Sequence, residues 1–299
     1  MEFSGEEREQ CRRLVREGLR EDLGDAGDVT TRALITPEHM GKARMVARGS
    51  GVLAGLEAAE LVYGELDANV RLERMRRDGE RVESGYTLAR LAGPAGSILS
   101  GERLALNFVQ RLSGIATLTR RYVDAVAGTA ARIYDTRKTT PGWRALEKYA
   151  VRAGGGFYHR SGLFDAVLIK DNHLAVLAEL EPGWPAAERI GAAVKAARAA
   201  APAGTVVEVE VESLEELDAA LEAEADLILL DNFPVERTVE AVRRRNARRR
   251  GTGLEASGGI TLENVAAVAG SGVERISIGA LTHSAAALDI ALDWDHAQG

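Results

Sequence analysis

Cysteine is almost absent from this chain of 299 residues, in which Cys11 stands alone. A single cysteine forms no disulfide within the chain and cannot build a cysteine-rich zinc site. Aromatic residues make up only 5%, which disfavours the stacked rings that hold nucleic-acid bases or methylated cations. Because the chain forms no internal disulfide that would need an oxidising compartment, we expect a protein of the reducing cytoplasm.

Long apolar runs and an excess of positive charge are missing as well. No run approaches the roughly 18 apolar residues of a membrane-spanning helix, and the acidic, polar N-terminus is unlike a signal peptide. The formal net charge is −7, whereas nucleic-acid binders are usually basic. We therefore expect neither a membrane nor a nucleic acid as partner, and any anion site must be a local cluster of cations.

Helices and strands are mixed in the first part of the chain, which is 45% hydrophobic overall and can bury a sizeable core. Apolar periodicity predicts helices over 6–22, 55–65 and 98–126, the last interrupted at Ser113-Gly114. Alternation predicts strands over 42–54, 70–75 and 86–92. We expect an N-terminal α+β domain over residues 1–115, with a C-terminal helix over 284–299 packed on it.

A different pattern begins at residue 132, where short apolar runs recur and each ends in polar or glycine residues. The runs are 133–134, 166–169, 206–212, 227–230, 254–256 and 276–278, with 155–159 as a shorter seventh, and helical patterns lie between most of them. Strand, polar end and helix in repetition are typical of a parallel α/β barrel. About seven strands predict an incomplete barrel over residues 116–283, with a doubly wound open sheet as the alternative.

The most informative segment is 135–144, Asp-Thr-Arg-Lys-Thr-Thr-Pro-Gly-Trp-Arg, which follows the first of these runs. Arg137 offers a planar fork that fits a carboxylate or phosphate, and Lys138 offers a compact ammonium. A solvated basic loop is the plainer interpretation. Arg144 follows as a third cation, for which we find no separate role.

Catalytic residues of such barrels lie where strands end, so the other strand ends matter too. They add the basic residues His159, Arg160 and Lys170, the acidic residues Glu210 and Asp231, and the glycine-rich ends at 257–259 and 279–280. Glycine-rich ends of the last strands commonly bind phosphate, and carboxylates suit Mg²⁺ or sugar hydroxyls. Together they predict a site for a phosphorylated sugar and a separate carboxylate-bearing molecule.

Plainer interpretations remain open for several of these residues. Glu208, Glu210 and Glu212 alternate and share a face, which either points inward with partners or a metal or lies on a wet edge strand. Asp231 could cap the next helix, and 257–259 could be only a turn.

His159 and His283 could likewise be ordinary histidines with satisfied hydrogen bonds. The arginine-rich run 243–250 predicts the solvated end of a helix that starts near Val235, with a nucleic-acid patch as the alternative.

Nine segments, in order, resemble the quinolinate phosphoribosyltransferase family, also called nicotinate-nucleotide pyrophosphorylase (carboxylating). They are 102–117, 135–142, 145–150, 159–160, 168–173, 207–211, 229–233, 255–260 and 279–283, and the N-terminal stretch 21–31 also fits. Any one segment is weak evidence, whereas nine in the family's order are specific and cover nearly the whole chain.

The resemblance implies a reaction, a fold and an assembly. Quinolinate and phosphoribosyl pyrophosphate would give nicotinate mononucleotide, pyrophosphate and CO2, a step of de novo NAD synthesis that requires Mg²⁺. The fold would be an N-terminal α/β sandwich domain followed by an incomplete α/β barrel. The assembly would be a homodimer with a shared active site, and whether it goes on to a hexamer is open.

The resemblance also assigns residues to each ligand. The quinolinate set is Arg103 (contributed to the neighbouring subunit's site), Thr136, Arg137, His159, Arg160 and Lys170. The phosphoribosyl pyrophosphate set is Lys138, Glu210, Asp231, Ser257, Gly258, Gly259, Ser277, Ile278, Gly279 and His283. Of these, Lys138, Glu210 and Asp231 would be catalytic, and Glu210 and Asp231 would bind Mg²⁺ directly or through water.

Three positions depart from the family pattern and concern substrate fit more than reaction class. Tyr158 stands where Asn is common, Trp143 where Leu is common and Ser161 where Met is common. The competing hypotheses are a non-carboxylating relative that acts on nicotinate, a homologue tied to molybdenum transport, and a nucleic-acid-binding protein. The intact 170–173 motif and the paired arginines argue against the molybdenum-transport hypothesis.

Overall fold

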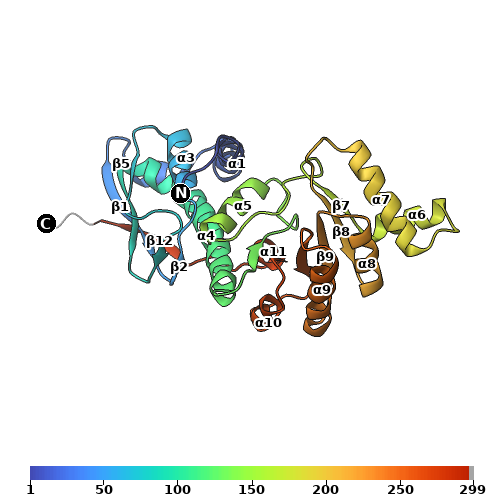
Figure 1. The fold of residues 1–299 in the computed structure, drawn as a ribbon. Coiled ribbons are helices and arrows are strands. Elements are labelled where there is room, and N and C mark those ends of the chain that lie inside the picture. Colours follow the sequence, from blue (N-terminus) through green and yellow to red (C-terminus); the bar gives the residue numbers. More distant parts are fainter. Residues whose placement is uncertain (296–299) are drawn as a thin grey trace. The chain divides into compact units, whose positions relative to one another are not determined.

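The computed structural model describes residues 1–295, which form two compact units (Figure 1). Unit 1 comprises Met1–Arg120, Lys138–Gly156 and the segment from Ala280 onward, and unit 2 comprises Arg121–Arg137 and Phe157–Gly279. Each unit is thus assembled from separate stretches of the chain. The sequence predicted a division at residue 115 with the C-terminal segment packed on the first domain, but not the return of 138–156 to unit 1.

Unit 1 contains an antiparallel sheet in the order β12-β1-β5-β3. Its strands are β1 (Met40–Ala47), β3 (Arg71–Arg74), β5 (Thr87–Pro94) and β12 (Ile290–Trp294), and β2 (Gly51–Val52) pairs separately with β4 (Arg81–Val82). The helices of this part are α1 (Gly5–Leu23), α2 (Val29–Leu34), α3 (Leu56–Leu66), α5 (Arg144–Ala153) and α11 (Ala280–His283). Helix α1 begins with a capping box between Ser4 and Glu7 and packs on α3 and α5.

Strand β12 replaces the helix expected over 284–299, so that prediction is wrong for the residues that form the strand. Met45 of β1 pairs with Leu292, and Ala47 pairs with Ile290, which is buried. Gly41 makes room for the ring of Trp294, because a Cβ at Gly41 would lie 2.2 Å from that ring. The open edge of β1 therefore determines the conformation of this segment, and the last part of the predicted helix, 296–299, lies outside the described residues.

Helix α4 (Ala95–Ala125) runs without a break, so the predicted interruption at Ser113-Gly114 is also wrong. The hydroxyl of Ser113 accepts a hydrogen bond from the backbone N–H of Ala54 (2.9 Å) and donates to its carbonyl (3.1 Å). A Cβ at Gly114 would lie only 2.1 Å from the carbonyl oxygen of Ala286. These small residues let other segments approach the helix closely instead of ending it.

Unit 2 is built on six parallel strands in the order β6-β11-β10-β9-β8-β7. They are β6 (Arg132–Tyr134), β7 (Val167–Ile169), β8 (Val207–Val211), β9 (Leu227–Asp231), β10 (Gly253–Ser257) and β11 (Arg275–Ser277). Phe157 adds a parallel bridge to Tyr134, which makes the short run 155–159 the seventh strand position. Among the described residues no ladder joins Phe157 to β7, which agrees with the predicted incomplete barrel.

The helices of unit 2 are α6 (Asp171–Leu180), α7 (Ala186–Ala200), α8 (Leu214–Glu222), α9 (Val235–Arg248) and α10 (Val265–Gly270). Helices α7, α8 and α9 pack side by side along the strands (Figure 1). Ser213 caps α8 by accepting a hydrogen bond from the N–H of Glu216 (3.1 Å). No helix within residues 1–295 has both the length and the apolar composition needed to cross a membrane.

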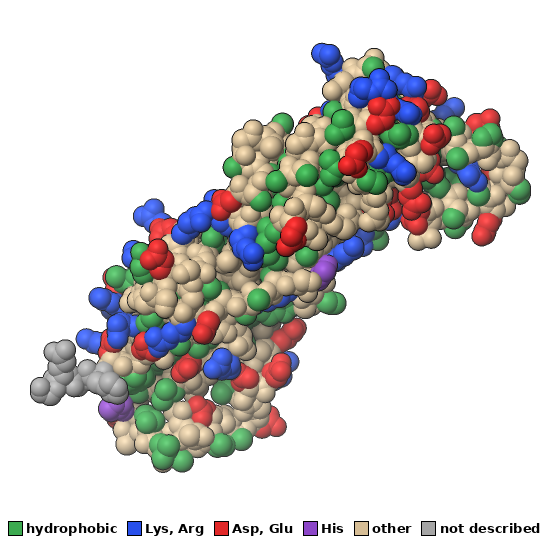
Figure 2. Space-filling view, turned by 90° about the horizontal axis from the view of Figure 1, so that it is seen from below, with side chains coloured by type: hydrophobic (Ala, Val, Ile, Leu, Met, Phe, Trp, Pro, Cys, Tyr) green, Lys and Arg blue, Asp and Glu red, His purple; other side chains and the backbone are tan. Residues whose placement is uncertain are grey.

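The arginine-rich run forms the end of α9, as the sequence predicted. Most of its guanidinium groups meet carboxylates; the ion pairs are Arg243–Glu240, Arg244–Asp218, Arg245–Glu274, Arg248–Asp218 and Arg249–Glu224. On the face shown in Figure 2, cationic and anionic side chains are interspersed. These pairs cancel much of the local positive charge, which disfavours the nucleic-acid hypothesis.

Candidate functional site

The carboxyl ends of the parallel strands in unit 2 lie at one edge of the sheet and gather most of the predicted site residues there. The residues at this edge are Thr136 and Arg137 after β6, His159 and Arg160 after Phe157, Lys170 after β7, Glu210 in β8, Asp231 in β9, Ser257, Gly258 and Gly259 at β10, and Ser277, Ile278 and Gly279 at β11. Arg103, Lys138 and His283 belong to unit 1.

Lys170 and Glu210 form an ion pair between neighbouring strand positions. The carboxylate of Glu210 is mostly buried, whereas the side chain of Lys170 is 42% exposed. Strand β8 lies between β7 and β9, so the edge-strand interpretation of its glutamates is wrong. Its inward-facing carboxylates have cationic or imidazole partners. These partners offset the free-energy cost of burying a charged group.

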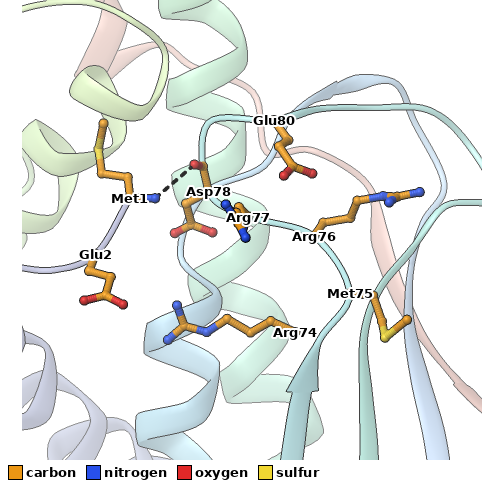
Figure 3. Close-up of a pocket in the computed structure, with 8 residues that line it drawn as sticks. All are labelled: Met1, Glu2, Arg74, Met75, Arg76, Arg77, Asp78 and Glu80. Carbon is orange, nitrogen blue, oxygen red and sulfur yellow. Dashed lines mark hydrogen bonds between the residues drawn. The ribbon is translucent and has the colours of Figure 1, made fainter.

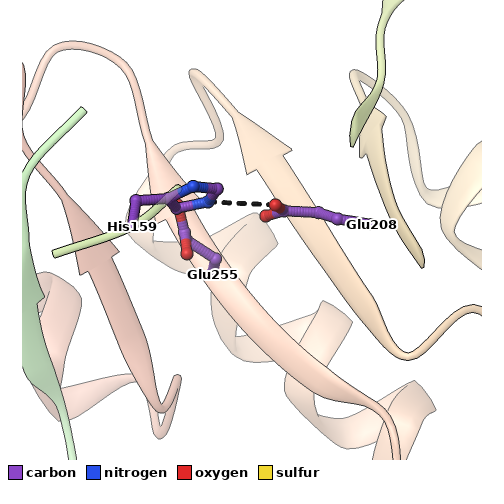
Figure 4. Close-up of side chains that lie close together, drawn as sticks. All are labelled: His159, Glu208 and Glu255. Atoms are coloured by element: carbon purple, nitrogen blue, oxygen red, sulfur yellow. Dashed lines mark ion pairs between the residues drawn. The ribbon is translucent and has the colours of Figure 1, made fainter. Parts of the chain in front are cut away.

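His159 lies between two buried glutamates from β8 and β10 (Figure 4). Its Nε2 is 2.9 Å from Oε2 of Glu208 and 3.4 Å from Oε1 of Glu255. The three side chains come from the run 155–159, from β8 and from β10, and they form one buried cluster in unit 2.

Glu255 and Arg275 were missed by reasoning from the sequence, although a charged residue inside the apolar run 254–256 was the available signal. Nε of Arg275 lies 2.6 Å from Oε2 of Glu255, and the guanidinium stacks 3.9 Å from the ring centroid of Tyr134. Burial, with the charge of Glu208 beside it, raises the pKa of Glu255, although His159 and Arg275 oppose the shift. This carboxyl group therefore tends to keep its proton.

The pKa of His159 reflects opposing influences. Burial lowers it, whereas the hydrogen bond to Glu208 and the charges of Glu255 and Glu208 raise it, and the net shift is upward. The titrations of His159 and Glu255 are thus linked. The negative charge of Glu255 raises the pKa of His159. When Glu255 takes up a proton, this contribution is lost.

Asp135 and His159 tie the first two strand ends together. The buried carboxylate of Asp135 accepts a hydrogen bond from the N–H of His159 (2.8 Å), and the N–H of Asp135 donates to the carbonyl of Phe157 (3.0 Å). Nδ1 of His159 accepts a hydrogen bond from the N–H of Arg160 (2.9 Å). Arg137 and Arg160 are thereby carried on adjoining backbone segments.

Arg160 is a buried cation close to a second cation. Its pKa is lowered, first by burial and then by the positive charge of Arg137, while acidic neighbours such as Glu208 oppose the shift. Two guanidinium groups that destabilise each other in a partly buried position are stabilised by an anion between them. This geometry suits a ligand with two carboxylates.

The end of β10 requires glycine at positions 258 and 259, because of the backbone conformation and because the end of β9 lies close by. Gly258 has φ +83° and Gly259 φ +60°, and a Cβ at Gly258 would lie 2.3 Å from Oδ1 of Asn232. Nδ2 of Asn232 donates to the carboxylate of Asp231 (2.8 Å). Helix α9 begins at Val235, and its N-cap residue is Pro234, which makes no side-chain cap hydrogen bond. Asp231 is therefore not a helix cap, and its carboxylate lies beside the glycine turn.

Ile278 uses its backbone N–H within the sheet, where it donates to the carbonyl of Tyr134 (2.9 Å). It therefore holds β11 beside β6, and a phosphate at this end would have to use other donors.

The segment that follows Lys138 is fixed within unit 1. Buried Glu147 accepts hydrogen bonds from the N–H (3.0 Å) and hydroxyl (2.9 Å) of Thr140 and from Arg111 (2.8 Å). The hydroxyl of Thr282 donates to the carbonyl of Lys138 (2.8 Å). These bonds tether the segment to α5 and α11.

Trp143, Arg144 and His283, also in unit 1, have local contacts. Trp143 stacks on Phe108 with ring centroids 4.8 Å apart, and Nε of Arg144 donates to the hydroxyl of Thr139 (3.1 Å). Nδ1 of His283 is 2.6 Å from the hydroxyl of Ser284. Trp143 is thus a packing residue of unit 1.

A separate cavity of about 610 Å³ lies in unit 1 (Figure 3). Its lining contains none of the predicted site residues; the lining residues are Met1, Glu2, Arg74, Met75, Arg76, Arg77, Asp78 and Glu80. Arg74 is paired with Glu60, and the ammonium of Met1 donates to the carbonyl of Asp78 (3.5 Å). Its cations and anions are mixed, so we assign it no ligand.

The fold and site define an α/β-barrel protein that gathers cationic side chains, acidic groups and glycine turns at its strand ends. The chain belongs to the quinolinate phosphoribosyl transferase family, since models of that family's N-terminal and C-terminal domains match residues 28–113 and 115–293.

Similar proteins cover nearly the whole chain. Nicotinate-nucleotide pyrophosphorylase [carboxylating] of Mycobacterium leprae is 49% identical over 95% of this chain and 96% of its own length. The probable enzyme of the same name from Bacillus subtilis is 44% identical over 95% and 93%. The structure of the nicotinate-nucleotide pyrophosphorylase from Francisella tularensis has a TM-score of 0.88 at 38% identity and covers 96% of this chain and 97% of that one.

Proposed function

We propose that the protein transfers the phosphoribosyl group of phosphoribosyl pyrophosphate to quinolinate with loss of CO2. The products are nicotinate mononucleotide and pyrophosphate, and the reaction is a step of de novo NAD biosynthesis. The family and the names of its relatives support this function. The observation that carries it is the buried Arg160 beside Arg137, a pair of cations that suits two carboxylates.

The proposed quinolinate pocket uses cations from three strand ends. Arg137 and Arg160 bind the carboxylates, and Lys170 adds a third positive charge. Thr136 is assigned to the same pocket, and His159 lies beside Arg160 at the strand end. Arg103 is proposed to enter the neighbouring subunit's site, which makes the active unit a homodimer, and a larger assembly such as a hexamer is compatible with the same shared site.

Phosphoribosyl pyrophosphate is proposed to bind at the acidic and glycine-rich strand ends. The 5′-phosphate meets the backbone around the β10 and β11 ends and His283; the residues are Ser257, Gly258, Gly259, Ser277, Gly279 and His283, while Ile278 holds β11 beside β6. Lys138 lies between the two substrates and contacts the leaving pyrophosphate.

Glu210 and Asp231 are the proposed Mg²⁺ ligands, directly or through water. They offer carboxylate oxygens from strands β8 and β9, which are hydrogen-bonded neighbours in the sheet, and such hard donors fit this ion. Mg²⁺ neutralises charge on the pyrophosphate when it is bound. The two carboxylates also stabilise the positive charge that develops on the ribose ring as the bond to pyrophosphate breaks.

Decarboxylation needs no dedicated cofactor. Once the ring nitrogen of quinolinate is bonded to ribose it is cationic, and it stabilises the electron pair left on the adjacent ring carbon when CO2 departs. That carbon then takes up a proton from water, which gives nicotinate mononucleotide. The residues of this chain bind and orient the substrate for that step. We place the protein in the cytoplasm, a proposal supported by the lone, buried cysteine.

Substrate choice separates this function from that of a non-carboxylating relative. Calorimetric titration should show that quinolinate binds more tightly than nicotinate, because nicotinate leaves one of the paired arginines without a carboxylate. Equal or tighter binding of nicotinate would favour the non-carboxylating alternative.

A further inference from the structure

We propose that His159 is a positioning residue, clamped by Glu208 and Glu255, which holds the backbone of Arg160 so that its guanidinium faces quinolinate together with Arg137. The proposal rests on the proposed binding of quinolinate by these two arginines. It goes further in assigning His159 a role that does not use a ring nitrogen as a ligand of the substrate.

Both ring nitrogens of His159 already face protein groups. Nδ1 accepts the hydrogen bond from the N–H of Arg160 at 2.9 Å, so this nitrogen carries a lone pair and the ring proton is on Nε2. Nε2 lies 2.9 Å from Glu208 and 3.4 Å from Glu255, inside the barrel. The two ring nitrogens are therefore directed at the backbone of Arg160 and at the two carboxylates.

The same three side chains resemble a metal site, because their ligand atoms lie within 4.8 Å of one another. A metal on Nε2 would need a lone pair there and a proton on Nδ1. The N–H of Arg160 points at Nδ1 and opposes that arrangement. Arg275, already paired with Glu255, adds a further positive charge beside the cluster. The geometry thus favours a clamp over a metal centre.

The clamp connects to the substrate-facing arginines through the backbone. Asp135 accepts from the N–H of His159, and the residue after His159 is Arg160, while Arg137 lies two residues beyond Asp135. Rotation of the imidazole would break its bond to Arg160 and free that peptide. Glu208 and Glu255, each almost fully buried, leave the ring little freedom to rotate.

Two substitutions separate positioning from direct contact. The amide oxygen of Asn can take the place of Nδ1, whereas the longer Gln can take the place of Nε2. If His159 positions Arg160, His159→Gln should raise the KM for quinolinate about tenfold more than His159→Asn. The difference corresponds to the loss of the hydrogen bond that the buried N–H of Arg160 donates. If Nε2 contacts quinolinate, the order reverses, and that order would overturn the proposal.

The clamp itself is tested by Glu255→Gln and Glu208→Gln. Each should raise the KM for quinolinate several-fold, about the effect of weakening one buried contact, with a smaller change in the KM for phosphoribosyl pyrophosphate. Equal changes in both constants would indicate a general structural defect and would contradict the proposal. Thermal unfolding of each variant identifies those that fail to fold.

Nitrogen NMR of histidine-labelled wild-type protein does not depend on catalysis, and it uses the variant His159→Asn only to assign one signal. At a pH above the raised pKa of His159, its signal, identified by its loss in His159→Asn, should show a neutral ring protonated on Nε2, before and after quinolinate is added. A ring protonated on Nδ1, or on both nitrogens, would overturn the inference. Absence of quinolinate binding to the wild type would instead reject the proposed function, so the two failures are distinguishable.

Discussion

Lys170 at the end of β7 forms an ion pair with Glu210 of β8, although the two residues are proposed to serve different substrates. Lys170 is assigned to quinolinate and Glu210 to the ribose and Mg²⁺. When quinolinate binds Lys170, or when the ribose or Mg²⁺ binds Glu210, the ion pair between the two residues must open. Binding of one substrate therefore alters the charge that is available to bind the other.

Loss of this pair should therefore uncouple the two substrates. We expect Lys170→Met to weaken quinolinate binding by about tenfold or more, because a charged hydrogen bond to a carboxylate is lost. The effect of a phosphoribosyl pyrophosphate analogue on quinolinate affinity should shrink in the variant. Calorimetric titration with and without the analogue measures both, and unchanged coupling would show that the ion pair does not link the sites.

Arg137→Ala should weaken quinolinate binding by about a hundredfold, since roughly 3 kcal/mol is lost when a desolvated carboxylate loses its arginine partner. Arg243→Ala is the matched control, because Arg243 pairs with Glu240 on the exposed face of α9. Equilibrium binding of quinolinate compares the variants. Unchanged affinity in Arg137→Ala would show that the assignment of this residue is wrong.

A shared active site can be tested by subunit mixing. Arg103→Ala and Lys138→Ala chains should each be nearly inactive alone, and random assortment into dimers should restore about a quarter of wild-type activity, because each mixed dimer keeps one intact site. Re-association of a single variant with itself is the control. A mixture that recovers nothing would indicate that each site is built from one chain.

The raised pKa of Glu255 predicts a dependence of stability on pH. Its pKa in the folded protein is above the ordinary value of 4.5, so the folded state holds this proton more tightly than the unfolded state. The contribution is complete below pH 4.5 and is lost as pH rises toward the raised pKa. Urea unfolding over this range should show a steeper fall in the free energy of unfolding for wild type than for Glu255→Gln. Parallel curves would contradict the raised pKa.

Two glycines in helices of unit 1 should respond oppositely to alanine. Gly114→Ala puts a Cβ 2.1 Å from the carbonyl oxygen of Ala286 and should destabilise the protein by about 2 kcal/mol or more. Gly64→Ala in α3 meets nothing within 4 Å and should stabilise by about 0.5–1 kcal/mol. Denaturant midpoints measure both, and a neutral Gly114→Ala would show that the segment at Ala286 can move aside.

Periodicity and polar strand ends were sufficient to predict the incomplete barrel and the solvated end of α9, because these features depend on local patterns. The segment that forms β12 was misjudged, since its alanine-rich start favours a helix and only the edge of β1 makes it a strand. The break at Ser113-Gly114 was misjudged for a related reason: close approach by distant segments cannot be seen in the local sequence.

Reasoning from the sequence found the strand-end cations and carboxylates but missed how they are held. Glu255 looked like part of an apolar run, and Arg275 like a residue before one. Their contact with each other and with His159 depends on the order of strands in the sheet, which brings β10 and β11 together. Resemblance to the family supplied roles for single residues, and the structure supplied the partners through which those residues are positioned.

The most direct test of the central claim is the product balance of the purified protein with quinolinate, phosphoribosyl pyrophosphate and Mg²⁺. Pyrophosphate, CO2 and nicotinate mononucleotide should appear in equal amounts, and omission of any one component or chelation of the metal should stop all three. Pyrophosphate release without CO2, or turnover with nicotinate but not with quinolinate, would contradict the proposed function.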